Sequence, residues 1–506
     1  MRTKFLSLIA GLLFASILSG CGGSSSSGQS VSTGVYKDAG IVSGLQYKTA
    51  TQSGVTDKDG TFRYVPGETV TFSVSNVVIG QVAGAGTITT FDLVGITPPT
   101  SSSGIPLNNP ASKKFQEAAN ISLFLQTLDD DSNPTNGINI PSAANNVVAN
   151  TPINFKIYAD FFNVKPYNGF GESPQFKVFI GSCRTAKVWS GGKAIAKPSI
   201  ALNNIYKGLG ISPNVYFRSK STYSDNTSVN FEYGISGLVS KENSNYDPTS
   251  TINSYTTYTY DANGNKTYEI YTHLTNPTSN YSLTYTYDLN GNQIRRVNTD
   301  NSGRSISSLT SEYDINGNVT KSQRYSGDVL EAFSLYLYNS NGTLSREDYY
   351  NADGSLNYSW SYSYDANLLP TNIRFNDTTS SSSNTFVYDA SQQVIQLEYF
   401  IDGALINTMT LSYDVNGNPL LVNLSGRINY RTDYSWDNKG LLLSSTDYDQ
   451  NNQMTATVVY TYDNNGNCIN TKVTNADGSS STTTTTYLNQ TGWGDILNYF
   501  IFGSPT

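Results

Sequence analysis

Hydrophobic and polar residues alternate over long parts of the second half of the chain. From Tyr281 to Tyr287 every second residue is Tyr or Leu, with Ser or Thr between them, which is the pattern of a strand with one buried face. Asp288-Leu-Asn-Gly-Asn292 follows directly. Asn290-Gly291 readily adopts the positive φ angles of a type I′ turn, and Asp288 can hydrogen-bond to the turn backbone. The pattern therefore predicts a β-hairpin.

The same pattern recurs along residues 231–490. The residue that enters the turn recurs every 23 to 27 residues, and Tyr precedes it in every copy except the one at Trp436. The turn-entry residues are Asp261, Asp288, Asp314, Asn339, Asp365, Asp389, Asp414, Asp437 and Asp463. Several units also hold a second turn near their middle, as at Asn301-Ser-Gly303. Each unit therefore predicts two strands and two turns in an antiparallel meander.

The expected fold class is mainly β. Since a sheet of more than ~10 strands curls or closes, we expect the array to form an open curled sheet or a hollow shell. Residues 36–100 alternate over short segments divided by Gly and Asp, which predicts a small β-sandwich-like domain. In residues 101–150, apolar residues at three- and four-residue steps predict one helix from about Ser112, as N-cap, to Leu128, followed by an acidic loop.

Two regions carry weaker signals. Residues 151–230 show no pattern that assigns them a fold. Residues 491–506 include the apolar run from Ile496 to Phe502, which we expect to cap the open edge of the sheet.

Composition supports the β assignment and excludes one class of partner. The chain has 37 Tyr and 21 Phe, and only 14% of its residues are charged, which suits sheets better than helical packing. Its net charge is −8, whereas nucleic-acid binding needs a basic face to neutralise phosphates. We expect no nucleic-acid partner.

The first residues predict export. Arg2 and Lys4 precede an apolar run, and residues 1–20 read as a signal peptide. The run is shorter than the about 20 residues of a transmembrane span. Residues 21–35 are rich in Gly and Ser and predict a flexible tether.

Leu18-Ser-Gly-Cys21 resembles the lipobox of bacterial lipoproteins. The resemblance implies that Cys21 becomes the first residue and carries the lipid, so that the membrane is a partner through an N-terminal anchor. Gly22 and Gly23 follow, with no Asp after the cysteine, which by the same resemblance implies the outer membrane, on its periplasmic or cell-surface face.

Candidate catalytic chemistry is sparse. The single histidine, His273, has no neighbouring nucleophile motif, and a lone strand histidine is usually structural. The repeated aspartates belong to turns. We therefore expect a non-enzymatic protein with no catalytic residues and no cofactor. Cys183 and Cys468 could pair in an oxidising compartment or remain two separate thiols.

Asp129, Asp131 and Asn133 stand at the alternating spacing of calcium ligands. However, Pro134 takes the place of the glycine that such a loop needs, and Ile140 takes the place of its bidentate Glu. The alternative is an acidic loop that uses Asp and Asn for turns. Calcium is thus the one metal that the sequence suggests.

Tyr358, Trp360, Tyr362 and Tyr364 lie on one face of a predicted strand. If that face meets solvent, it is a platform for sugar rings, because aromatic faces stack on sugars. The alternative is that the row is the packed inner face of the sheet.

The motif Tyr-Thr-Tyr-Asp-x-Asn-Gly-Asn, which ends at Asn265 and again at Asn467, resembles the YD repeats of the Rhs family. In that family long arrays wrap into a β-shell around a toxic C-terminal domain, and shorter arrays occur in cell-surface proteins. Only some forty residues follow the last clear unit here, so toxin delivery is not expected.

These patterns together favour an outer-membrane lipoprotein with a structural, adhesion or interaction role, and a glycan or protein ligand at the cell surface. Two alternatives stay open: a carbohydrate-binding module that uses the aromatic faces, and a calcium-stabilised envelope scaffold.

Overall fold

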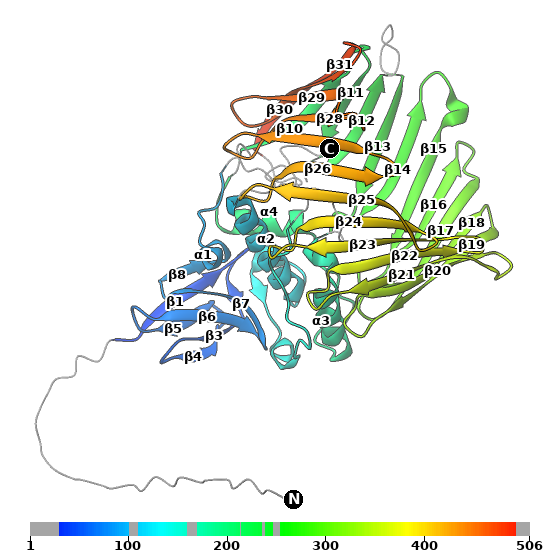
Figure 1. The fold of residues 1–506 in the computed structure, drawn as a ribbon. Helices are drawn as coiled ribbons and strands as arrows, with labels where there is room; N and C mark the ends of the chain where they lie inside the picture. The colour runs from blue at the N-terminus through cyan, green and yellow to red at the C-terminus, as the bar shows by residue number, and fades with distance from the viewer. Residues whose placement is uncertain are drawn as a thin grey trace, which may run out of the picture.

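The computed structural model describes residues 30–100, 110–158, 169–212, 214–234, 238–245 and 253–491. The predicted anchor at Cys21 and the predicted cap from Ile496 to Phe502 lie outside these residues. Figure 1 shows a small β domain and a group of helices, both at one end of a large β-barrel. Among the described residues, no helix is both long and apolar enough to cross a membrane.

The N-terminal domain consists of two small sheets. One has the strand order β5 (Thr61–Tyr64), β1 (Ser32–Lys37), β8 (Thr87–Thr89). The other has the order β4 (Ser53–Val55), β3 (Gln46–Lys48), β6 (Thr69–Val74), β7 (Val77–Ala83). Phe62 of β5 packs edge-on against Phe72 of β6, with ring centroids 5.2 Å apart. The two sheets therefore enclose an aromatic core, as a β-sandwich does.

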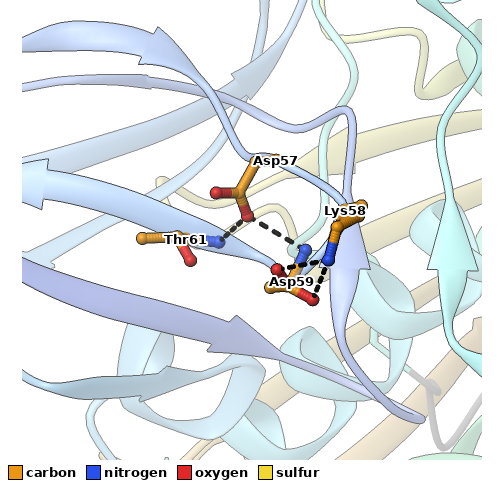
Figure 2. Close-up of polar contacts among 4 residues, drawn as sticks. All are labelled: Asp57, Lys58, Asp59 and Thr61. Atoms are coloured by element: carbon orange, nitrogen blue, oxygen red, sulfur yellow. Dashed lines mark hydrogen bonds and ion pairs between the residues drawn. The ribbon is translucent and has the colours of Figure 1, made fainter.

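The turn between β4 and β5 shows how this chain builds its hairpins (Figure 2). One oxygen of Asp57 accepts the backbone N–H groups of Asp59, at 3.0 Å, and of Thr61, at 2.9 Å. The N–H of Gly60 donates to the carbonyl of Asp57, and Gly60 has a φ of 70°. Lys58 pairs with Asp59 at 2.7 Å in full solvent exposure. The Asp carboxylate therefore satisfies donors that the tight turn leaves free.

Helices follow the small domain. They are α1 (Thr90–Val94), α2 (Pro110–Leu128), α3 (Pro174–Thr185) and α4 (Pro198–Gly208), with 3-10 turns at Pro134–Asn136, Ser142–Asn146 and Phe170–Glu172. The predicted N-cap at Ser112 is wrong, because α2 begins at Pro110 and Ser112 is buried inside it. Proline fits the first turn of a helix, where its missing N–H would have no partner. A short parallel pair, β2 (Val42–Ser43) with β9 (Ile138–Asn139), joins the loop after α2 to the small domain.

A buried carboxylate links the small domain to the helices. Asp38 is fully buried and accepts hydrogen bonds from Thr90 at 2.5 Å and Ser122 at 2.8 Å, and from Gln126 at 3.1 Å. Burial raises the pKa of Asp38, and these hydrogen bonds oppose the rise. One continuous core of buried apolar residues runs from β1 through α2 to α4. The small domain and the helices therefore form one body.

The repeat array forms a closed barrel of 22 strands, β10 to β31, each paired with its neighbours in sequence. β10 pairs with β31 along Asn214 to Thr222, which closes the ring. The strands are β10 (Asn214–Thr222), β11 (Ser228–Tyr233), β12 (Val239–Asn245), β13 (Ser254–Tyr260), β14 (Lys266–His273), β15 (Tyr281–Tyr287), β16 (Gln293–Asp300), β17 (Ser305–Tyr313), β18 (Val319–Ser326), β19 (Val329–Tyr338), β20 (Leu344–Asn351), β21 (Leu356–Tyr364), β22 (Pro370–Asp377), β23 (Ser381–Tyr388), β24 (Val394–Ile401), β25 (Ala404–Tyr413), β26 (Pro419–Gly426), β27 (Tyr430–Trp436), β28 (Leu442–Tyr448), β29 (Met454–Tyr462), β30 (Cys468–Asn475) and β31 (Ser480–Thr491). Of the two expected forms, the open sheet is wrong and the closed shell is the one formed, because closure pairs both free edges.

The turns at Asp261, Asp288 and their equivalents do not have the type I′ geometry predicted from Asn-Gly. At Asp288 the N–H of Gly291 donates to the carbonyl of Asp288, whose own N–H donates to the carbonyl of Asn292. Gly291 has a φ of 77°, whereas the φ of Asn290 is not positive. This is a type I turn followed by a left-handed glycine, which suits a three-residue hairpin loop. Asp288 binds the N–H groups of Asn290 and Asn292, as Asp57 does in its turn.

The aromatic residue before most of these turns ties one unit to the preceding unit. The hydroxyl of Tyr287 donates to the carbonyl of Lys266 at 2.8 Å. The same contact is made by Tyr260, Tyr313, Tyr364, Tyr388, Tyr413 and Tyr462. Trp436, the exception in sequence, makes it with its indole N–H, at 2.7 Å from the carbonyl of Pro419. The repeated aromatic residue is therefore a hydrogen-bond donor between units as well as a packing group.

Gln392 occupies the left-handed glycine position of its turn, with a φ of 64°. It is exposed, so its side chain contributes little packing. We expect Gln392→Gly to raise the free energy of unfolding by about 0.5 to 1 kcal/mol, because a non-glycine residue is strained there. Urea unfolding measures the change. Ser391→Gly, one residue earlier at ordinary φ, is the matched control and should give no gain; an equal gain there would contradict the explanation.

Candidate functional site at the barrel lumen and aspartate rim

The wall of the barrel has two different faces. The residue directly before each repeated Tyr or Trp is exposed: Thr259, Thr286, Glu312, Leu337, Ser363, Val387, Ser412, Ser435 and Thr461. The Tyr residues on the other face are half-buried. Tyr233, on the Tyr face, packs against the core of the N-terminal body, and the charge of Glu172 acts on Tyr313. The Tyr face is therefore the inner face of the barrel.

The barrel is wide. Twenty-two strands at about 4.8 Å spacing and a tilt of ~40° enclose a ring roughly 40 Å across. Barrels of this strand number enclose a channel or a plugged lumen rather than a core packed by side chains. The structure shows one small buried cluster on the described wall, formed by Phe386, Val394, Leu411 and Val422.

We call the end formed by the turns at Asp261, Asp288, Asp314, Asn339, Asp365, Asp389, Asp414, Asp437 and Asp463 the aspartate rim. The other end, with turns such as those at Asp300, Asn351 and Asp449, is the far rim. Both rims use the turn of Figure 2; for example, Asp449 accepts the N–H groups of Asn451 and Gln453 at 2.8 Å. The helices lie at the aspartate rim (Figure 1).

The helices, with their loops in residues 110–158 and 169–212, span this mouth, and we call them the plug. Lys113, near the start of α2, donates to the carbonyl of Asn416 in the turn between β25 and β26. Thr127, at the other end of α2, binds the N–H of Ala196, beside the turns of β13 to β16. These turns lie on opposite sides of the ring of 22 strands. With 19 residues, α2 is about 28 Å long and reaches across much of the mouth.

Cations of the plug hold carbonyl groups of the rim turns. Arg184 donates to the carbonyl of Ile315 at 2.9 Å, Lys197 to that of Gly264 at 2.6 Å, and Lys113 to that of Asn416 at 3.1 Å. Burial lowers the pKa of Arg184, and the charges of Asp288 and Asp314 oppose this. Burial likewise lowers the pKa of Lys113, against the charges of Asp414 and Asp389. The aspartates thus favour the charged state of the cations that bind the rim.

Close packing adds to these polar contacts. Gly181 of α3 lies directly on Asn316, and Gly192 lies directly on Leu289, with no room for a Cβ at either glycine. A crevice of about 530 Å³ remains between plug and rim, bordered by Lys177, Lys193, Asn265 and Asn292. Lys177 is paired with Glu172 at 3.1 Å. Lys193 is bound by the carbonyl of Asp129 and by Ser132. The crevice is therefore lined both by paired lysines and by apolar residues such as Ile195 and Leu289.

The predicted calcium residues lie in a loop that holds an internal cation. Asp131 accepts hydrogen bonds from the N–H of Asn133 and the amide of Asn136, both at 2.8 Å. The buried ammonium of Lys193 donates to the carbonyl of Asp129 and, at 2.7 Å, to Ser132. In the described part of the chain no three His, Cys, Asp or Glu side chains are arranged to hold a metal ion. The geometry fits the alternative of an acidic turn loop.

The two cysteines are separate thiols. Cys183 is buried in α3, and Cys468 begins β30. Gly181, two residues before Cys183, contacts the turn between β17 and β18, which lies across the ring from β30. Of the two expected alternatives, a disulfide or separate thiols, the structure therefore has the separate thiols. Burial raises the pKa of Cys183 to about 12, which makes this thiol unreactive.

The predicted sugar platform lies on the inner wall. Tyr358, Trp360, Tyr362 and Tyr364 are half-buried there. Tyr358 stacks on Tyr349 of β20 with centroids 4.6 Å apart and planes 3° apart, and Trp360 packs on Phe375 of β22 at 4.9 Å. Tyr358 and Trp360 thus each pack against a ring on a neighbouring strand, which is how aromatic pairs stabilise adjacent strands. The arrangement fits the packed inner face better than a free platform.

His273 serves a loop. Its Nδ1 atom accepts the N–H of Asn276 at 3.0 Å. The cations that bind the rim, Lys113, Arg184 and Lys197, were not singled out by sequence. The only signal in the sequence was that they are basic residues in a chain with few charged residues. This signal does not reveal what they contact.

Comparisons with known proteins leave the family open. No protein-family model matches the chain, and no curated protein matches it in sequence. Among solved structures, the Photorhabdus luminescens Tc holotoxin pore aligns with 58% of this chain and 20% of its own, at 14% identity and a TM-score of 0.24. A porin-like protein from Bacteroides uniformis aligns with 54% of this chain and 98% of its own, at 13% identity and a TM-score of 0.22. The chain thus spans about a fifth of the toxin chain, and neither superposition is close.

Arg184→Met should loosen the plug. The change keeps an unbranched apolar stem but removes the hydrogen bonds of Arg184 to the carbonyls of Ile315 and Lys193. We expect a loss of about 2 kcal/mol in unfolding free energy, as for a hydrogen bond to a charged group. Amide exchange should become faster in residues 192–197. Arg304→Met on the far rim, where Arg304 is exposed, should change neither, and equal effects of the two variants would contradict this role.

Asp129 gives the acidic loop a pH dependence. Burial is the main cause that raises the pKa of Asp129 to about 6. The folded chain therefore binds this proton more tightly than the unfolded chain, and the cost of burying the charge is relieved as pH falls through about 6. We expect Asp129→Asn to raise Tm relative to wild type at pH 7.5, with the difference shrinking as pH falls below about 6 and vanishing only below the ordinary Asp pKa of 3.8. A Tm difference that is constant with pH in calorimetry would contradict this.

Proposed function

We propose that the protein is a non-enzymatic, lipid-anchored protein of the bacterial outer membrane that presents a barrel of the Rhs YD-repeat type for adhesion or ligand binding. One observation carries the proposal: the N-terminal body spans one mouth of the barrel. The anchor expected at Cys21 and the far rim therefore belong to opposite ends of the molecule.

The path of the chain supports this orientation. The described residues begin at residue 30, just before β1 of the small domain, which lies at the plugged end (Figure 1). The Gly- and Ser-rich residues 21–35 are long enough to separate the small domain from lipid headgroups. A chain held at Cys21 would thus turn its far rim away from the membrane.

The repeated contacts support the relation to YD repeats. In most units the Tyr binds the preceding unit, as Tyr287 binds Lys266, and the Asp fixes the turn, as Asp288 does. Tyr and Asp therefore have the same architectural role in successive units. This accounts for a Tyr-Asp pair that recurs without catalytic partners.

Polar and apolar residues are mixed on the exposed outer face of the wall, where Leu337 and Val387 stand among polar residues. Its exposed residues beside the aspartate rim include Thr286, Glu312 and Ser363, and Glu312 lies 3.8 Å from Lys321 on the same face. A barrel that spans a membrane shows lipid an apolar band flanked by aromatic residues. The proposal therefore places the barrel beside the membrane, with only the lipid on Cys21 inserted into the membrane.

Cys21→Ser tests the anchor. We expect wild-type protein in the outer-membrane fraction and the variant in the soluble envelope fraction or the medium, because the lipid is the proposed attachment. Cys468→Ser is the control and should stay with the membrane. Membrane association of Cys21→Ser would overturn the anchor.

The interaction role has its own measurement. Purified mature chain added in excess should inhibit attachment of the producing cells to their surface or to one another, since it competes for the same ligand. Heat-denatured chain is the control. Attachment that depends on the protein but is unaffected by the folded competitor would contradict a binding role of the barrel.

A further inference from the structure

The aspartate rim binds cations of the plug at three of its turns. Three turns hold a Lys or Arg side chain on a loop carbonyl: the turns at Asp261, Asp314 and Asp414. The N–H groups of each turn donate to the Asp carboxylate or to the Asp backbone carbonyl, so the other loop carbonyls remain as acceptors. The nearby carboxylates add attraction for the bound cation. Each turn is thus a small cation-binding unit.

Two further turns of the same build border a groove. Asp437 accepts the N–H groups of Lys439 and Leu441, and Asp463 those of Asn465 and Asn467, at 2.7 to 2.9 Å. The groove between these turns has a volume of about 720 Å³. Its walls include Asp437, Lys439, Leu443, Tyr460 and Asp463. Among the plug contacts that the structure describes, none is made with these two turns.

We infer that this groove docks a basic segment of a partner protein, in which a Lys or Arg side chain is flanked by an apolar residue. The cation binds a loop carbonyl there, as Arg184 binds that of Ile315 and Lys197 that of Gly264 on the covered turns. The apolar neighbour fits Leu443, a residue that is 39% exposed. The inference rests on the proposed interaction role and names the chemistry of the ligand.

Charge decides between ligand classes. Asp437 and Asp463 attract a cation, and Lys439, on the same turn as Asp437, opposes it. A net negative chain of charge −8 adds long-range attraction for a basic partner. An acidic ligand would be repelled by the two aspartates and attracted by only one lysine. The groove therefore favours a basic segment, and Lys439 limits the affinity.

The test uses the purified mature chain and a fluorescein-labelled dodecapeptide that carries two Arg-Leu pairs. The same peptide with Glu in place of Arg is the comparison probe. Anisotropy should show saturable binding of the Arg peptide, weakened by salt, and no binding of the Glu peptide. No binding of the Arg peptide would overturn the inference.

Two variants with opposite expected effects on the affinity for the Arg peptide locate the site. Asp463→Asn should weaken binding about fivefold, the size expected for a partly exposed ion pair. Lys439→Asn should tighten it by a similar factor. Asn339 shows that the turn accepts Asn in place of Asp, and Asn is the usual residue at the position of Lys439, so both variants should fold.

Asp449→Asn is the matched control, because it changes net charge as Asp463→Asn does but lies in the far-rim turn between β28 and β29. It should leave binding unchanged. Equal weakening by both variants would show diffuse attraction and overturn the site. If the Arg peptide binds only after removal of residues 492–506, these residues of the chain itself occupy the groove. That result would overturn the inference of a partner protein. Neither outcome affects the anchor and attachment experiments, which use no peptide.

Discussion

The hydrogen bonds of one carboxylate to the N–H groups two and four residues ahead underlie the whole architecture. Asp57 forms them in the small domain and Asp288 in the barrel (Figure 2). A glycine in the left-handed conformation completes the turn. Because these donors are satisfied within the turn, the loop carbonyls are left for other partners. The rim is therefore both a stable edge and a surface of acceptors.

The barrel relies on backbone pairing more than on a dense core. Most side chains of its wall are half-buried, and closure by β10 with β31 satisfies the groups that an open edge would leave free. The contact of Tyr287 with Lys266 and its equivalents adds a polar link between successive units. The N-terminal body, in contrast to the barrel, is packed around a continuous apolar core. The dense part of the molecule thus braces the wide part.

The two mouths of the barrel differ because only one is spanned. Lys113, Arg184 and Lys197 bring positive charge from the plug to the aspartate rim. The far rim has turns of the same build but, among the described residues, no plug contact of this kind. This asymmetry gives the molecule an anchored end and a presented end. It also separates covered from uncovered turns on the aspartate rim itself, where the groove beside Asp463 lies.

The sequence by itself determined the local structure: the strand period, the Tyr-Asp recurrence, the turns and the helix α2. These depend on residues within a few positions of one another, and the hydrogen bonds of Asp288 reach only to Asn292. Its prediction of a type I′ turn at Asn290 was wrong because the intrinsic preference of Asn-Gly does not fix the loop length. Composition also indicated β structure and little charge.

Only the tertiary structure decided how these pieces meet. Closure pairs Thr222 with Thr484, and no local pattern specifies partners so far apart in sequence. The short helices α3 and α4 lack a long periodic signal, so their place across the mouth was not predictable. The same holds for Cys183 and Cys468, which lie on different sides of the ring, and for Lys193, whose ammonium fills the acidic loop. Such contacts depend on the three-dimensional course of the whole chain.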